Sequence, residues 1–206
     1  MLETKRYLNC ALTDAINKRD FRRVKKLVAE GANVNAADKY GLLPLVEAVR
    51  RNHEHIFLKD RRPKLYADDK KEESIAEYLV LKGADCNAKE DKRQGHTALI
   101  QAVCTRDLTF VQFLISNGAK VEVRDNEGFT PLLVAVETDE LYLTQYLVSI
   151  NANVFAKNND GQDVIALARG KRVKKFLVET LREKVCRVLN KIVNNDLARF
   201  IASYVY

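Results

Sequence analysis

A period of 33 residues is the feature of this sequence that most constrains its fold. Four glycines in turn-like settings are separated by steps of 54, 33 and 33 residues: Gly41, Gly95, Gly128 and Gly161. Four positions that would end helices show steps of 52, 35 and 33: Gly31, Gly83, Gly118 and Asn151. Self-similarity at such a period indicates a repeat array, in which each unit buries its apolar face against its neighbours.

One complete unit runs from Asp125 to Ala156. It opens with a turn around Gly128, since glycine readily adopts the positive φ that such turns require. Thr130 then stands as an N-cap, and Pro131 as the first helical residue. Apolar residues at helical spacing predict two short helices, with Leu132, Ala135 and Val136 in the first and Leu143, Tyr146 and Leu147 in the second. Asn151 suits the left-handed position that ends the second helix.

The repeated segments resemble the ankyrin-repeat family. The first half of the family motif matches GFTPLLVAV, GHTALIQAV and GLLPLVEAV, and the second half matches EGANVNAAD, KGADCNAKE, NGAKVEVRD and INANVFAKN. The resemblance covers roughly residues 8–182. It implies an all-α ankyrin-repeat solenoid at residues 1–182, with about five repeats at 8–38, 39–90, 91–124, 125–157 and 158–182.

The sequence departs from the family motif at two positions. The threonine that caps the first helix survives only as Thr97 and Thr130, and Leu43 replaces it in the second repeat. The motif histidine, which in the family ties neighbouring repeats together by hydrogen bonds, is absent from every copy. Its position is occupied by Thr13, Val46, Ile100, Leu133 and Ala166. We expect apolar packing to replace the missing hydrogen bonds, or the array to be looser.

The second repeat is interrupted by 19 inserted residues, 53–71, between its two helices. Insertions in repeats usually map to loops, so we predict a surface loop, with a partner-contacting element as the alternative. The hairpin tip of the third repeat, Lys89 to Gln94, is two residues longer than its neighbours and should project further.

Residues 183–206 do not fit the repeat. Two apolar stripes predict two helices, with Val185, Val188, Leu189, Ile192 and Val193 in the first and Leu197, Phe200, Ile201 and Tyr204 in the second, which would start at Asn194 to Asp196. We expect these helices to form a C-terminal cap on the open end of the array. The alternative is a docking helix for a second partner protein, because helices that bind grooves use the same spacing.

The net charge of +7 is concentrated in residues 169–191, which hold nine basic and two acidic residues. The simplest interpretation is a solvated end of the array. Anion binding by this segment, to acidic lipid or nucleic acid, is an alternative function that we do not favour; it would weaken steeply with salt.

The four cysteines are far apart and form no CxxC pair: Cys10, Cys86, Cys104 and Cys186. They are typical of reduced, structural cysteines, which predicts a cytoplasmic, intracellular protein. No apolar run approaches the roughly 18 residues of a membrane span. Delivery into a host cell, as an effector, is left open by analogy with the family.

No motif for nucleotide binding or hydrolysis is present: the sequence lacks GxxxxGK[ST], GxGxxG and GxSxG. His53, His55 and His96 have no cysteine at ligand spacing, and the carboxylates are scattered. We therefore predict no catalytic, metal or cofactor site, and a protein that is not an enzyme.

The resemblance places the binding face on the concave side, which is built from hairpin tips and first helices. Tyr40, Leu42 and Phe129 are the candidate anchors, although they could instead pack on neighbouring loops. Carried over position by position, the predicted partner-binding residues are Tyr40, Leu42, Arg50, Arg51, Arg93, Gln94, His96, Thr105, Glu127, Phe129, Glu137, Gln162 and Arg169.

Charge changes sign along this predicted face, from Arg50, Arg51 and Arg93 to Glu127 and Glu137. We expect the partner to be charged in the opposite sense, and reversal of Arg50 and Arg51 to weaken binding without unfolding the array. The predicted protein is a monomeric, non-catalytic interaction module for another protein. An adaptor that joins a second protein through its C-terminal helices is the alternative.

Overall fold

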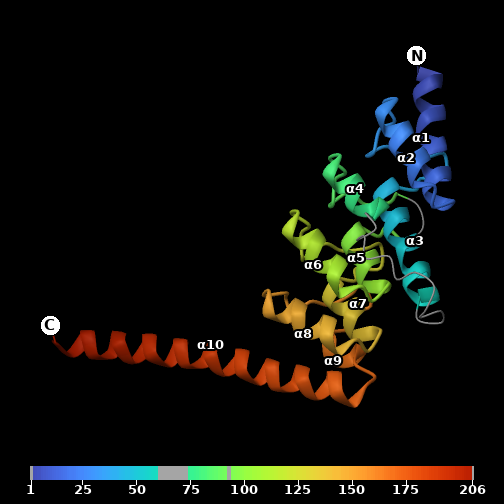
Figure 1. The fold of residues 1–206 in the computed structure, drawn as a ribbon. Coiled ribbons are helices and arrows are strands. Elements are labelled where there is room, and N and C mark those ends of the chain that lie inside the picture. The colour runs from blue at the N-terminus through green and yellow to red at the C-terminus, as the bar shows by residue number, and fades with distance from the viewer. Residues whose placement is uncertain (1, 60–73, 92–93, 206) are drawn as a thin grey trace.

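The computed structural model describes the backbone of residues 2–59, 74–91 and 94–205, and the side chains of residues 6–51, 74–91 and 94–191. These residues contain ten helices and no strand. Figure 1 shows the helices in two columns. The inner column holds α1 (Leu2–Asn17), α3 (Pro44–Lys59), α5 (Ala98–Cys104), α7 (Pro131–Glu137) and α9 (Val164–Leu167), and the outer column α2 (Phe21–Ala29), α4 (Ile75–Leu81), α6 (Leu108–Ser116) and α8 (Leu141–Ser149).

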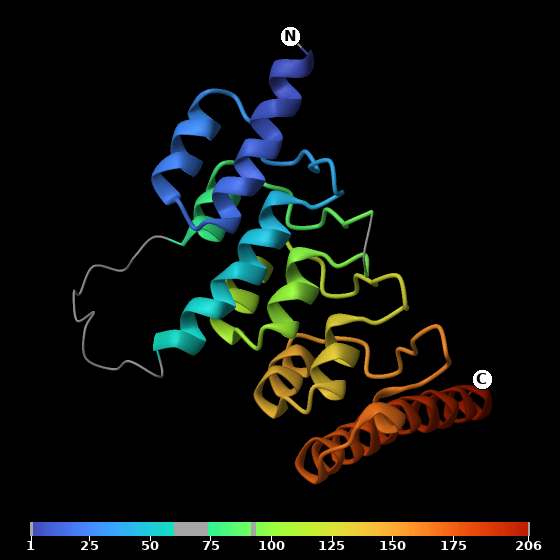
Figure 2. The same ribbon diagram turned by 90° about the vertical axis from the view of Figure 1, so that its right-hand side faces the viewer.

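Each inner helix packs against the outer helix that follows it and against the next inner helix. The chain ends with α10 (Lys171–Val205), which contacts α8 and α9 and so completes the fifth pair. The loops between successive pairs project along one side of the array, as Figure 2 shows. The predicted all-α solenoid of about five repeats is confirmed.

Local sequence explains where the helices begin and end. The Thr97 and Thr130 side chains cap α5 and α7 by accepting hydrogen bonds from Ile100 N and Leu133 N. Asn151, which ends the fourth pair, has a φ of 66°, as its position predicted. Short polar side chains and left-handed residues satisfy the backbone groups that a helix end leaves unpaired.

The core is one apolar cluster that runs from α1 to α10. Three of the five positions that lack the motif histidine lie inside it: Val46, Ile100 and Leu133. Thr13 is buried but is not part of the apolar cluster, and Ala166 is exposed. Apolar packing therefore does replace the histidine at most of these positions.

Side-chain amides add a second link between repeats. Asn35 donates from Nδ2 to the Gly83 carbonyl at 2.9 Å and accepts at Oδ1 from Asp85 N at 2.7 Å. Asn87 makes the same pair of bonds to the following repeat, and Glu122 accepts one bond from the repeat after that. These polar ties lie on the exposed loops, away from the position of the missing histidine.

The insert of the second repeat begins as helix rather than loop. Helix α3 continues to Lys59, so residues 53–59 extend it, while residues 60–71 lie outside the described residues. The lengthened tip of the third repeat includes residues 92–93, which also lie outside them.

The C-terminal segment is a single helix, so the expected division into two helices is wrong, although the start of this helix does pack against the end of the array. Helix α10 crosses both the expected boundary at residue 182 and the expected break at Asn194 without interruption. No glycine or proline occurs between residues 171 and 205 to stop it. Val173 and Leu177 are buried against the array, but the helix then runs away from it (Figure 1). Within the described part of the chain, no helix has the length and apolar character needed to cross a bilayer.

Candidate functional site

Four loops each expose one side chain immediately before their turn glycine. We call these side chains the tip row: Tyr40, Gln94, Glu127 and Asp160. The equivalent positions of successive repeats thus carry an aromatic, an amide and two carboxylate groups. A row of different side chains on equivalent backbone positions is what a recognition surface on a repeat scaffold requires.

Adjacent loops of the third to fifth repeats are joined through their backbones. Asn126 N donates to the Gln94 carbonyl and Asn159 N donates to the Glu127 carbonyl, both at 2.9 Å. A Cβ atom at Gly95 would collide with Asn126, and one at Gly128 would collide with Asn159. Glycine is therefore required at these two positions by close packing as well as by positive φ.

An aspartate holds the conformation of two of these loops. Asp38 Oδ1 accepts hydrogen bonds from Tyr40 N at 2.8 Å and Leu42 N at 3.0 Å. Asp125 Oδ1 accepts the equivalent bonds from Glu127 N at 2.9 Å and Phe129 N at 2.8 Å. Because the tip backbone is fixed in this way, a partner would meet preorganised side chains.

Tyr40 is the exposed aromatic residue of the tip row, at 60 % relative exposure. Lys39 Nζ lies 4.8 Å from the centre of its ring, and hydrogen bonding to Tyr40 raises the pKa of Lys39 above its ordinary value. Leu42 and Phe129, the other predicted anchors, are buried, and so are His96 and Thr105. The prediction that these four contact a partner directly is wrong, because their side chains pack inside the array.

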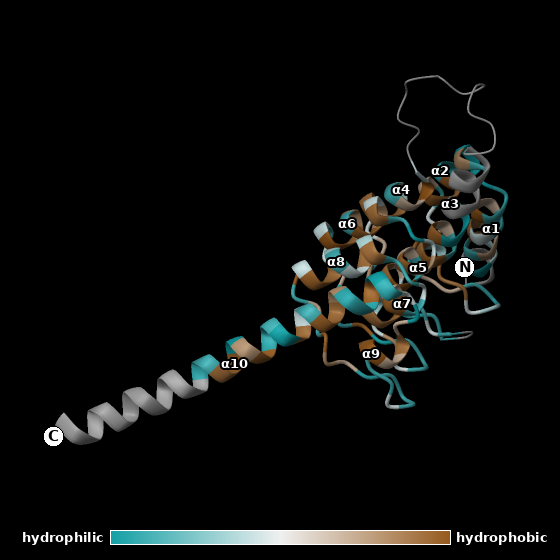
Figure 3. Cartoon of the chain, turned by 90° about the horizontal axis from the view of Figure 1, so that it is seen from below, coloured by the Kyte–Doolittle hydropathy of each residue, from teal (hydrophilic) through white to brown (hydrophobic). Residues whose placement is uncertain are grey.

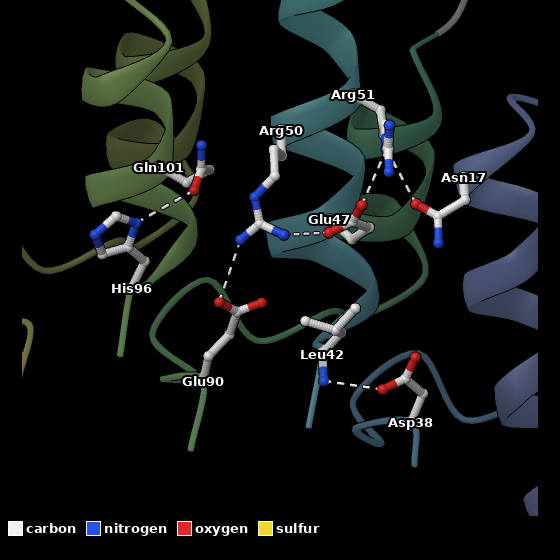
Figure 4. Close-up of polar contacts among 9 residues, drawn as sticks. All are labelled: Asn17, Asp38, Leu42, Glu47, Arg50, Arg51, Glu90, His96 and Gln101. Atoms are coloured by element: carbon white, nitrogen blue, oxygen red, sulfur yellow. Dashed lines mark hydrogen bonds and ion pairs between the residues drawn. The ribbon is translucent and has the colours of Figure 1, made fainter. Parts of the chain in front are cut away.

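Arg50 and Arg51 belong to a charged cluster at the second repeat (Figure 4). Arg50 pairs with Glu47 and, at 3.3 Å, with Glu90. Arg51 Nε lies 3.0 Å from both Glu47 Oε1 and Asn17 Oδ1. Both glutamates are buried, and the arginine side chains are 24 % and 36 % exposed. Two arginines and two glutamates leave no excess charge, so the expected positive end of the face is neutralised internally.

Glu47 and Glu90 are the residues of this cluster that were not predicted from the sequence. Glu47 precedes Arg50 and Arg51 by three and four residues, which on a helix brings the side chains together. That spacing was a usable signal for one of the two pairs. Glu90 is 40 residues from Arg50, and no local pattern indicates their contact.

His96 lies in a second polar group beside this cluster. Its Nδ1 is 3.2 Å from Gln101 Oε1, as Figure 4 shows, and its Nε2 is 3.9 Å from Asp125 Oδ2. Cys104 is the last residue of α5, the helix that also holds Gln101. Burial raises the pKa of the Cys104 thiol to about 11, with the negative charge of Asp125 as the next cause. A thiol with this pKa stays protonated at neutral pH and is a poor nucleophile.

Two further predicted residues, Gln162 and Arg169, lie in the fifth repeat. Arg169 is mostly exposed and lies 3.8 Å from Glu137 of the preceding repeat. Gln162 is exposed, and its Oε1 accepts a hydrogen bond from Asn158. Arg93 lies outside the described residues. Of the side chains that the structure describes, no group of three or more His, Cys, Asp or Glu could hold a metal ion.

The comparisons with known proteins agree with this architecture. Residues 65–158 match the family model for ankyrin repeats in three copies. No curated protein matches the sequence significantly. Ankyrin repeats are in general modules for protein–protein interaction, and the family is typically non-enzymatic. With its matched repeats, its five helix pairs and its projecting loops, this chain is an ankyrin-repeat solenoid.

Proposed function

We propose that this protein is a non-catalytic binding module that holds a partner protein against the tip row and the adjoining ends of the inner helices. The observation that carries the proposal is the tip row itself. Its four side chains are not identical, and all are exposed. Equivalent hydrogen bonds within and between repeats hold their loops in place. Such preorganisation lowers the entropic cost of binding.

The chemistry of the tip row defines the partner. Tyr40 offers an aromatic ring that can fill an apolar pocket, the kind of side chain that most often dominates interface energy. Glu127 and Asp160 are exposed carboxylates, and Arg50 and Arg51 are neutralised by their own glutamates. The partner should therefore present an apolar pocket to the second repeat and basic or hydrogen-bond donor groups to the fourth and fifth.

An affinity pull-down from cell extract with mass spectrometry tests this function. The bait is the full chain, washed at low salt and at about 0.3 M salt, because exposed charge pairs weaken as the Debye length shrinks. The test variant is Tyr40→Ala with Glu127→Lys. The matched control is Tyr142→Ala with Glu30→Lys, which makes the same changes at exposed positions of α8 and of the end of α2, away from the tip row.

We expect discrete proteins to be retained by the native chain and by the control at both salts, and to be lost from the tip-row variant. Their retention by the tip-row variant would overturn the assignment of this surface. Purified bait and partner should then bind with a Kd at least about tenfold lower for the native chain than for the variant.

We further propose that the protein works as a monomer in a reducing, intracellular setting. All four cysteines are unpaired, and burial raises the pKa of both Cys86 and Cys104, which suits thiols that do not react. Mass spectrometry of protein alkylated directly in cell lysate should find all four as free thiols. A disulfide in the native protein would contradict this setting.

A further inference from the structure

The exposed part of α10 carries an apolar stripe that nothing in the array covers. Val185, Val188 and Leu189 are 45 %, 57 % and 54 % exposed, and Val178 is also exposed. Figure 3 shows brown apolar positions alternating with teal polar ones along this part of the helix. An isolated helical stretch is only marginally stable in water, and most helices depend on packing of their apolar face.

The stripe has the spacing of a coiled-coil seam. Val178, Leu181, Val185 and Val188 follow one another at intervals of three, four and three residues, so they occupy alternating a and d positions of a heptad. Leu181 is half-buried at the edge of the core, and the others face solvent. A seam this narrow fits one partner helix.

The residues that flank the seam on α10 predict the charge of the partner helix. In this register Arg182 is at an e position, and Lys184 and Lys191 are at g positions. These are the positions whose charges select a coiled-coil partner. Residues 169–191 as a whole hold nine basic and two acidic residues. A second copy of this chain would place lysine and arginine against lysine and arginine, which disfavours a homodimer.

A membrane surface fits the stripe less well than a helix does. Interfacial helices bury a broad apolar face, commonly with aromatic residues, beneath a basic one. The exposed seam and its flank consist of three valines and one leucine, and the basic residues surround them: Arg187 lies on the side opposite the seam, and Arg182 beside it. The geometry is that of a helix pair.

We propose that residues 178–191 of α10 form a coiled-coil pair with an amphipathic helix of another protein, one that carries glutamate or aspartate at the positions flanking its own apolar seam. This surface lies on α10 and not on the tip row, so the two proposals stand or fall separately. Together they would make the protein a bridge between two partners.

The test measures binding of the full chain to two designed peptides of about four heptads, with identical leucine and isoleucine seams. One has glutamate at every e and g position and the other has lysine. We expect the acidic peptide to bind with a Kd at least about tenfold lower than the basic one. Binding should also raise the helical circular dichroism signal above the sum of the separate components.

Two variants and a matched control locate the surface. Val185→Gln with Val188→Gln removes the apolar seam at exposed positions and should weaken acidic-peptide binding at least about tenfold. Lys184→Glu with Lys191→Glu should reverse the preference toward the basic peptide. Arg172→Glu with Arg187→Glu makes the same change of net charge at b and c positions and should leave the preference intact. An unchanged thermal melt shows that each variant keeps the folded array.

Three results would overturn the proposal. Equal binding of both peptides would show that α10 does not select its partner helix by charge. A dimer in sedimentation velocity that Val185→Gln with Val188→Gln abolishes would assign the seam to a second copy of the chain. Binding to phosphatidylserine vesicles through the same two valines, with no binding of the acidic peptide, would assign it to a membrane.

Discussion

Helices α3 and α7 occupy the same place in the second and fourth repeats, yet different forces hold them. In α7, a threonine cap is followed by six buried residues, Pro131 to Val136. In α3, Leu43 stands where that cap would be, and Glu47 is buried at the position equivalent to Val134. Glu47 is accommodated because Arg50 and Arg51 lie on the same helix and pair with it.

The difference shows that one repeat position can hold an apolar or a charged side chain, depending on what its neighbours offer. An apolar helix such as α7 loses stability when volume is removed from the core. A helix built on buried charges loses it when one partner is removed and another charge is left unpaired. The two repeats should therefore fail in response to different substitutions.

Reversal of both arginines of α3 should have the largest effect. Arg50→Glu with Arg51→Glu would gather four carboxylates, since Glu47 and Glu90 are buried there, and we expect it to lower the free energy of unfolding by more than about 5 kcal/mol. Urea denaturation measures the change. This prediction differs from the one made from the sequence, in which the reversal leaves the array folded. Arg169→Glu, at the exposed pair near α7, should cost no more than about 1 kcal/mol.

Truncation of the core of α7 should come second. Leu133 is fully buried at a position where the family motif has histidine, and Leu133→Ala should lower the free energy of unfolding by about 3–4 kcal/mol. Leu189→Ala, at an exposed position on α10, should change it by less than about 0.5 kcal/mol. Equal losses in the two variants would mean that apolar packing does not substitute for the histidine.

Removal of the α7 cap should have a smaller effect. Thr130→Ala deletes the hydroxyl that accepts from Leu133 N and should cost about 1 kcal/mol. Thr130→Ser keeps that oxygen and should retain most of the stability. The comparison of the two variants by thermal or urea unfolding separates the hydrogen bond from the buried methyl group.

The thiol of Cys104 should show the smallest effect on stability but a clear one on reactivity. Burial raises its pKa to about 11 from 9.0, so the folded chain holds this proton where the unfolded chain would lose it. The stability that follows is present below about pH 9 and is lost as the pH rises toward 11. At pH 8, iodoacetamide should label Cys104 at least about tenfold more slowly than the exposed Cys186, as measured by peptide mass spectrometry. Similar rates would show that the inner helices open freely.

The sequence predicted which side chains of the candidate site are exposed only where the position in the repeat determines exposure. Tyr40, Gln94, Glu127 and Gln162 were placed on exposed loops because each adjoins a turn glycine. Leu42 and Phe129 follow their turn glycines as Gln162 does, yet these two side chains are buried and Gln162 is exposed, although Asp38, Asp125 and Asn158 accept the equivalent backbone hydrogen bond in all three loops. A motif alignment counts positions and does not contain that distinction.

The sequence by itself determined the period, the paired helices, the threonine caps and the left-handed residues that end helices, since these depend on side chains within a few residues of one another. The tertiary structure alone decided which charges meet and which apolar stripes are covered. Glu90 reaches Arg50 across 40 residues of chain. The stripe on α10 reads the same in sequence whether it packs on the array or faces solvent, and only the direction of the helix left it exposed.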